Sequence, residues 1–369
     1  MDGLRGVAAL VVVFHHALLV VPELAAPYMT GFESVSGLYF WLLYSPLHVG
    51  WAGTEAVYVF FVLSGFVLAR SVMRSSQFDW IAYFPSRLVR LYLPVVGAVA
   101  FAAATIAIVP RVGQVSSWVS FHPATYTVTT ILQDLVLIDG TSNVVSPLWS
   151  LQWEVLFSLL LPAIVVVARG RWFAVTVVLA LTLTTIGFFT GVLFVAFMPM
   201  FVIGVALAYH WGYVESASAR IAQRRSGAFI WLAVVGSSAV MLCSYWLLYP
   251  IAANSTLLIP LTRPIVVVGA VLLVIAAAMW APLKALLSRR LFQWLGLISF
   301  SLYLVHEPVI VALAYLIDDP RWVVLIGIAL ACAFAVGFFF LVERPSHRLA
   351  RKLHRSLGRY GSTAHESKA

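Results

Sequence analysis

Few ionisable side chains lie inside the apolar stretches of this sequence, and His16 is one of them. It follows Arg5 by eleven residues in the segment MDGLRGVAALVVVFHHALLVV. In an α-helix this spacing is about 16 Å and close to three turns, so both side chains lie on one face. An ionisable group inside a lipid-spanning helix is costly and is a functional candidate by default. Imidazole titrates near neutrality, so His16 suits a general base, while His15 points about 100° away and is expected to pack.

Three further ionisable residues are expected to reach the same region of a membrane. His306 lies at a similar depth in a late apolar stretch, and Glu154 enters from the opposite side, roughly 10 Å past Pro147. Glu55 lies near the outer end of another stretch. A carboxylate beside a histidine fixes its tautomer and stabilises the imidazolium form. Spacing leaves open whether these side chains meet.

Arg87 and Arg90 are three residues apart and share a face if their segment is helical. Together with Arg5 they are candidates for binding a phosphorylated ligand, because guanidinium groups match phosphate oxygens. The alternative is that all three are ordinary positive residues on the inner side of a membrane protein.

The composition defines the class of protein that holds these residues. The chain has 369 residues, of which 62% are hydrophobic and 10% charged, and its mean hydropathy is +0.99. A soluble domain carries about 25% charged residues, so this is a polytopic membrane protein. The net charge of +9 comes from basic residues in short loops, which argues against nucleic-acid binding. Cys243 and Cys332 lie inside predicted spans and form no metal-ligand pattern.

Runs of roughly 20 apolar residues predict an all-α protein with ten transmembrane helices. The predicted spans are residues 6–21, 51–69, 93–109, 147–168, 172–188, 192–211, 228–249, 264–281, 294–317 and 322–342. Residues 70–91 are expected to form a basic loop, and the long polar segment between the third and fourth spans is expected to offer acceptor-binding surface. We therefore predict one membrane domain over residues 1–345 and a basic tail over residues 346–369.

The distribution of basic residues orients these spans. With the N-terminus in the cytoplasm, all but three of the 23 lysines and arginines lie on the cytoplasmic side. The exceptions are Arg111, Arg263 and Arg321. This asymmetry predicts that both termini are cytoplasmic, in the inner or plasma membrane of a cell.

Six sequence blocks, in this order, carry a resemblance to a known family. They are MDGLRGVAALVVVFHHA, FFVLSGFVLARS, SRLVRLYLP, SPLWSLQWEVLFSLLLP, ISFSLYLVHEPV and VERP. Over nearly its whole length the chain resembles the acyltransferase 3 family of integral membrane acyltransferases. The resemblance implies transfer of an acyl group, often acetyl, from cytoplasmic acyl-CoA to a hydroxyl of a cell-envelope polysaccharide or a secreted glycoside.

The resemblance also implies roles for single residues. Arg5, Arg87 and Arg90 would bind the phosphates of CoA, and His16 would act as the base or carry the acyl group itself. Glu154 and His306 would orient His16 or bind the acceptor. The expected substrate-binding and oxyanion-stabilising groups are Glu55, Ser150 and Tyr303.

The expected partners are acyl-CoA, a carbohydrate or glycoside acceptor and the lipid bilayer. Acyl-CoA is expected as the donor substrate, and neither a bound cofactor nor a metal is predicted. The alternative from another class is a transporter or flippase, in which buried histidine and glutamate side chains form a proton relay. A membrane scaffold without activity would leave the buried ionisable residues unexplained.

Overall fold

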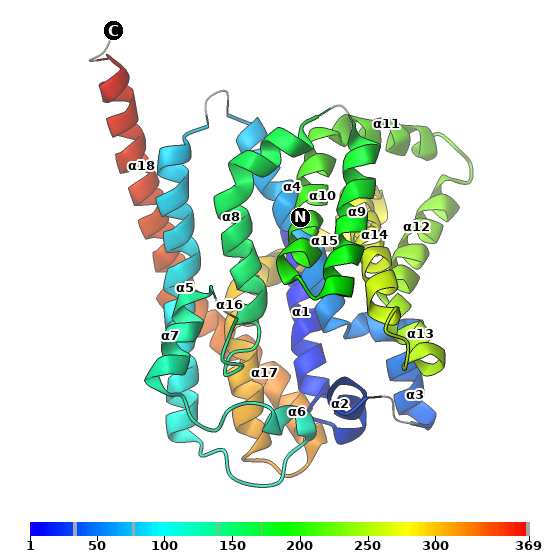
Figure 1. Cartoon of the computed structure of the whole chain (residues 1–369), viewed down its shortest axis with the longest axis vertical. Helices are drawn as coiled ribbons and strands as arrows, with labels where there is room; N and C mark the ends of the chain where they lie inside the picture. The colour runs from blue at the N-terminus through cyan, green and yellow to red at the C-terminus, as the bar shows by residue number, and fades with distance from the viewer. Residues whose placement is uncertain (32–34, 76–77, 139, 171, 367–369) are drawn as a thin grey trace. The chain divides into compact units, whose positions relative to one another are not determined.

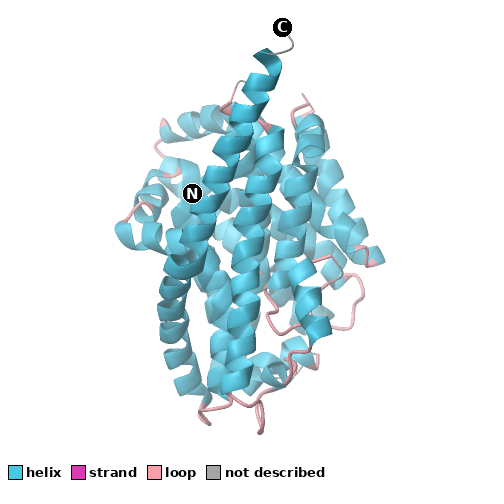
Figure 2. Cartoon of the chain, turned by 90° about the vertical axis from the view of Figure 1, so that its left-hand side faces the viewer, coloured by secondary structure: helices cyan, strands magenta, loops and turns pink. Residues whose placement is uncertain are grey.

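A computed structural model describes residues 1–31, 35–75, 78–138, 140–170 and 172–366, and these contain helices and loops but no strand (Figures 1 and 2). Arg171 and Lys368, two of the basic residues in the topology prediction, lie outside the described residues. Contacts between Cα atoms divide the chain into two units. The first unit is Met1–Ser71, Ser116–Trp118 and Leu161–Ser299, and the second is Val72–Val115, Val119–Leu160 and Phe300–Ala369.

Seven helices in the described part are long and apolar enough to cross a membrane. They are α4 (Gly53–Met73), α5 (Trp80–Ile108), α8 (Leu148–Ala168), α9 (Phe173–Thr190), α14 (Leu258–Met279), α16 (Arg290–Ala314) and the continuous helix Pro320–Leu357. The number rises to ten if each of three bent helix pairs is one span. The pairs are α1 (Asp2–Leu18) with α2 (Pro22–Met29), α10 (Leu193–Tyr209) with α11 (Trp211–Ala222), and α12 (Gly227–Leu242) with α13 (Ser244–Ala252). The ten predicted spans agree with this upper number.

The start of α5 corrects one predicted boundary. The stretch 70–91 was expected to be a loop, yet α5 begins at Trp80, where the Asp79 side chain accepts a hydrogen bond from the Ala82 backbone N–H at 2.9 Å. A cap of this kind satisfies a backbone donor that the first helical turn leaves without a partner. Arg87 and Arg90 therefore lie within a helix, where their spacing of three places them on one face. Mean hydropathy does not predict these first turns of α5 as part of a span, because the arginines lower it.

The first helix bends sharply where its apolar run ends. The segments α1 and α2 meet at an angle of 100°, with Pro22 as the first residue of α2. Proline suits this position because its fixed φ matches a helix and its missing N–H costs nothing there. The residues between the first two predicted spans include α2, α3 (Gly37–Tyr44) and the 3₁₀ helix η1 (Pro46–Gly50).

In the first unit, glycine lets two helices cross at close range. A Cβ atom on Gly65 of α4 would collide with the carbonyl oxygen of Phe201 on α10, and one on Gly204 would collide with that of Val62. Small residues at helix contacts are typical of membrane proteins, because association there depends on close packing. The same unit packs α9 against α10 and α14, and α12 against α14 (Figure 1). Its remaining helix is α15 (Ala281–Leu287).

The second unit is organised along α5. The helix α17 (Pro320–Phe338) continues through the π-helical turn η2 (Phe339–Glu343) into α18 (Arg344–Glu366), which lies beside α5 (Figures 1 and 2). Ser346 Oγ of α18 donates to the Val89 carbonyl of α5 at 3.0 Å. The predicted basic tail from residue 346 is thus a helical continuation of the last span. The polar segment before α8 contains α6 (Ser117–Ser120) and α7 (Val128–Val136).

Candidate active site

The two histidines of α1 have different surroundings. His15 is 6% exposed, and its Nδ1 lies 3.0 Å from the Trp51 carbonyl oxygen. Gly53 makes room for its ring, since a Cβ there would lie 2.5 Å from His15 Cγ. His16 is only half-buried, and its ring stacks on Trp118 with centroids 5.4 Å apart. His15 is therefore fixed by packing, as expected, whereas His16 presents an accessible imidazole.

A third histidine of the first unit was not predicted. His48 in η1 is completely buried, with Nδ1 3.3 Å from the Leu42 carbonyl oxygen and Nε2 3.3 Å from the Tyr28 hydroxyl. Burial, together with repulsion from the nearby His15, lowers the pKa of His48 to about 3. The ring is therefore neutral at physiological pH and packs against Trp51 and Trp246. It follows an apolar run without helical spacing, so the sequence offers little signal for it.

Glu55 forms an ion pair in the first unit. Its Oε1 accepts from Nη1 of Arg263 on α14 at 3.0 Å, and Glu55 is 2% exposed. The Arg263 guanidinium lies 4.8 Å from the Tyr245 ring centroid and 5.7 Å from that of Tyr58, distances suited to cation–π attraction. The predicted span begins at residue 264, which leaves Arg263 in a loop and gives Glu55 no partner within the membrane. The position of Arg263 next to an apolar run could have indicated the pair, because an ionisable residue inside a span needs a partner.

In the second unit, Arg87 contacts Glu154. Arg87 Nη2 lies 2.5 Å from Glu154 Oε1, and Arg87 Nε donates to Ser158 Oγ at 3.1 Å. Both edges of the guanidinium therefore bind α8, and the side chains of Arg87 and Glu154 are only 14% and 17% exposed. One residue predicted for CoA binding and one predicted for catalysis thus form a single pair. Arg90, one turn along α5, is exposed.

Two predicted donors bind each other. The Tyr303 hydroxyl on α16 lies 2.7 Å from Ser150 Oγ on α8, and Ser150 Oγ also donates to the Pro147 carbonyl at 3.1 Å. Because the serine hydrogen is directed to Pro147, the tyrosine O–H donates to Ser150. This bond joins the fourth sequence block to the fifth.

His306 lies on α16 and is completely buried. Its Nδ1 lies 2.8 Å from the Leu302 carbonyl oxygen, one turn earlier. A carbonyl only accepts, so Nδ1 carries the proton, and in the neutral ring Nε2 is the acceptor. The ring centroid lies 6.1 Å from that of Tyr303.

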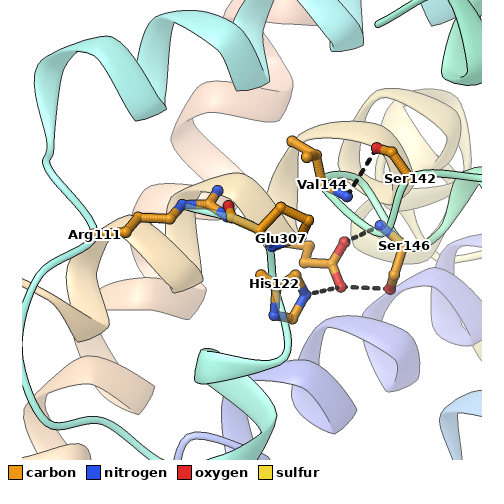
Figure 3. Close-up of polar contacts among 7 residues, drawn as sticks. Arg111, His122, Ser142, Val144, Ser146 and Glu307 are labelled. Atoms are coloured by element: carbon orange, nitrogen blue, oxygen red, sulfur yellow. Dashed lines mark hydrogen bonds and ion pairs between the residues drawn. The ribbon is translucent and has the colours of Figure 1, made fainter. Parts of the chain in front are cut away.

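The neighbouring Glu307 collects three hydrogen bonds (Figure 3). Its Oε1 lies 2.9 Å from His122 Nε2 and 2.5 Å from Ser146 Oγ, and its Oε2 accepts from the Ser146 N–H at 2.5 Å. The side chains of His122 and Glu307 are 0% exposed. Arg111, nearby in the view, donates Nη1 to the Pro123 carbonyl at 2.6 Å. Glu307 therefore fixes both ends of the segment that joins α6 to α8.

The same segment has a second anchor at Asp134 of α7. This completely buried carboxylate accepts from the Tyr126 hydroxyl at 2.6 Å and from both the N–H and the hydroxyl of Ser142, each at 2.6 Å. Burial and the Asp134 carboxylate raise the pKa of Tyr126. The predicted long polar loop is therefore an ordered structure held by internal bonds. The partners of Asp134 are each eight positions away, whereas His122 and its partner Glu307 are 185 positions apart, so spacing gave no signal for His122.

A last pair joins the fifth block to the sixth. Glu343 in the π-helical turn accepts from Ser301 N at 3.0 Å and from Ser301 Oγ at 2.5 Å, and it is 3% exposed. Turns of this kind are frequent at functional sites. Four blocks of the second unit are thus linked pairwise, through Arg87–Glu154, Ser150–Tyr303, Ser146–Glu307 and Ser301–Glu343.

The predicted site residues are divided between the units. Arg5, His16 and Glu55 belong to the first unit, and Arg87, Arg90, Ser150, Glu154, Tyr303 and His306 belong to the second. Convergence of His16 with Glu154 and His306 stays a prediction. Within the described part of the chain, no group of three or more histidine, cysteine, aspartate or glutamate side chains could hold a metal ion.

Comparison with known families defines the class of protein that carries these pairs. A family model described as an acyltransferase domain matches residues 1–342. The chain therefore belongs to the acyltransferase 3 family and is a multi-pass membrane acyltransferase. No curated protein and no solved structure matches the chain.

Proposed function

We propose that this protein transfers an acetyl group from acetyl-CoA to a hydroxyl of a cell-envelope glycan or a secreted glycoside. The observation that carries the proposal is the difference between the adjacent histidines of α1. His15 is buried and held by the Trp51 carbonyl, whereas His16 is half-buried on a helix that runs without a break from Arg5. Family membership supports the reaction class, and the accessible imidazole supports His16 as its base.

In the proposed reaction, His16 takes the proton of the acceptor hydroxyl as that oxygen attacks the thioester carbonyl carbon. The resulting tetrahedral intermediate expels the CoA thiolate, which receives the proton from the imidazolium, so the products are an ester and free CoA. Transfer through an acyl-histidine is the variant in which the imidazole nitrogen attacks first and the acceptor oxygen then displaces it.

We assign the donor side to the arginines. Arg5 and the exposed Arg90 contact the phosphates of CoA, because guanidinium groups form paired bonds with phosphate oxygens. Arg87 adds positive charge, but its fork already binds Glu154, so its main contribution is to hold α5 against α8. In the predicted topology these arginines face the cytoplasm, where acyl-CoA is found.

We assign the remaining predicted residues to the acceptor side of the reaction. Glu154 and His306 orient the reacting groups. Tyr303 donates to the oxyanion when its bond to Ser150 opens, and Ser150 does so when its hydroxyl also turns away from the Pro147 carbonyl. Glu55 acts through its pair with Arg263.

A matched pair of variants tests the role of His16. In purified protein in detergent, acetyl-CoA and extracted envelope glycan are supplied, and the release of the CoA thiol and the mass of the glycan are measured. His16→Gln is expected to lower turnover by about 10²–10⁴-fold, the usual range for a lost general base. His15→Gln, the same change at the adjacent position, is expected to retain most activity.

Full activity in His16→Gln would exclude His16 as the base. If acetyl-CoA is consumed by none of the proteins in detergent and solute movement occurs across sealed vesicles, the transporter alternative holds instead. A mass increase of one acetyl group on His16 after incubation without acceptor distinguishes the covalent route from direct transfer.

A further inference from the structure

The continuous helix formed by α17, η2 and α18 changes character at one residue. From Arg321 to Arg344 it carries an apolar stretch of about 34 Å, close to the hydrocarbon thickness of a bilayer. After the buried Glu343, Arg344 is the first exposed charged residue at the end of this stretch. The helix does not end there but continues with basic side chains.

Two opposite faces of α18 have different partners. Ser346 and Ala350 are buried, and Leu353 and Leu357 half-buried, at a spacing of four, three and four residues. This face lies against α5, where Ser346 Oγ donates to the Val89 carbonyl and His354 Nδ1 lies 3.5 Å from Ser86 Oγ. It holds α18 in a fixed orientation.

The arginines of α18 repeat with the same spacing, each two positions before a residue of the face that lies against α5. Arg344, Arg348, Arg351 and Arg355 are all exposed, and a shift of two residues is about 200° around a helix. These four residues, here called the arginine stripe, therefore point away from α5. For the same reason the stripe is no extension of Arg87 and Arg90, which lie on α5 itself.

The stripe continues a surface that faces lipid. Phe340, in the last turn of the apolar stretch, is 54% exposed, and the Arg344 guanidinium carbon lies 5.7 Å from its ring centroid. An exposed phenylalanine on a membrane span contacts acyl chains, so the arginine directly after it on the same face reaches the phosphate layer. Arginine side chains extend along apolar surface while placing their charge at this interface. Arg355 Nε donates to the Arg351 carbonyl at 3.3 Å, which keeps its side chain along the stripe.

We propose that the arginine stripe of α18 binds the phosphate groups of anionic phospholipids in the leaflet where the last span ends. Basic residues next to a span attract anionic headgroups, and guanidinium groups also form paired bonds with phosphate. Because α18 is packed along α5, bound lipid stabilises the second unit. This interaction is independent of the acyl transfer proposed above.

The test uses the full chain in lipid nanodiscs of phosphatidylcholine alone or phosphatidylcholine mixed with phosphatidylglycerol. The phosphatidylglycerol retained with the protein and the unfolding midpoint are measured. In the stripe variant, all four arginines are changed to glutamine. The control variant removes four exposed charges from the first unit through Arg220→Gln, Arg224→Gln, Arg225→Gln and Lys284→Gln. A third variant replaces the stripe with lysines, which keeps the charge.

The wild-type protein and the control variant are expected to enrich phosphatidylglycerol and to unfold at a higher temperature in its presence. The stripe variant is expected to show roughly tenfold lower enrichment and no shift of the midpoint, and the lysine variant to retain part of both. Added salt is expected to weaken the enrichment in the wild type. If the stripe variant does not fold, Arg348→Gln and Arg351→Gln are compared singly with Arg224→Gln, and each is expected to lower enrichment more than the control.

Two outcomes would overturn the proposal. One is an enrichment in the stripe variant equal to that of the wild type, or an equal loss in the control variant. The other is a stripe variant that keeps the phosphatidylglycerol preference but loses stabilisation by added CoA in phosphatidylcholine nanodiscs, since the stripe would then bind the acyl donor. Failure of acyl transfer in the His16 experiment changes neither readout.

Discussion

The first unit surrounds its histidines with aromatic rings, whereas the second unit binds its carboxylates with directed hydrogen bonds. His16 stacks on Trp118, and His48 packs between Trp51 and Trp246. In the second unit, Glu307 alone accepts three bonds, from His122 and Ser146. Glu55 and Arg263 form an ion pair in the first unit, and even there tyrosine rings flank the arginine.

This difference indicates that the two units have different roles. A carboxylate inside a membrane protein needs partners, and each partner fixes the distance and rotation of one segment against another. The four linked blocks of the second unit therefore have a defined register. Ring stacking is less directional and leaves His16 half-buried, which suits a side chain that must meet a substrate.

The largest effect on stability is expected from removing the Glu307 carboxylate of the second unit. Replacing it with alanine leaves the donors of Ser146 and the His122 ring without their acceptor, and losing one partner of a buried charged network costs about 3–5 kcal/mol. We expect the free energy of unfolding to fall by this amount and amide exchange to rise between α6 and α8. Glu215→Ala, at an exposed position on α11, is the control. Equal stability of both variants would contradict the network.

A smaller effect is expected from breaking the ion pair between Arg87 of α5 and Glu154 of α8. Arg87→Met and Glu154→Gln are each expected to cost about 2 kcal/mol of unfolding free energy, less than a fully buried pair because both side chains are partly exposed. The double variant is expected to cost less than the sum, with a coupling of about 1 kcal/mol. Additive losses would mean that the two residues act separately, and Arg87 would then be available for CoA phosphate.

The smallest effect concerns the first unit and its pH dependence. His48 has a folded-state pKa of about 3 against about 6.5 when unfolded, so the unfolded chain binds more protons between these values. Stability is full above pH 6.5 and falls on acidification, by at most about 1.4 kcal/mol per pH unit. We expect His48→Asn to flatten this slope in unfolding measurements from pH 7 to pH 5.5, where the loss is at most about 1.4 kcal/mol. An unaltered slope in His48→Asn would exclude His48 as its source.

Long apolar runs made most helices predictable. The fourth predicted span, residues 147–168, differs from α8 by one residue, because a run of this length has no alternative to a helix in lipid. The start of α5 was missed because a hydropathy window counts Arg87 and Arg90 as loop residues. Only the pairing of Arg87 with Glu154 shows why such a charge is tolerated inside the helix.

The sequence by itself determined that the chain crosses a membrane, which blocks carry ionisable residues, and that Arg5 and His16 share a helix. These properties depend on local composition and helical spacing. The tertiary structure decided which residue satisfies which charge: Arg263 for Glu55, Arg87 for Glu154, and His122 with Ser146 for Glu307. Such partners lie up to 208 positions apart in the chain. Spacing within one helix carries no information about contacts between helices, so only their packing could identify these pairs.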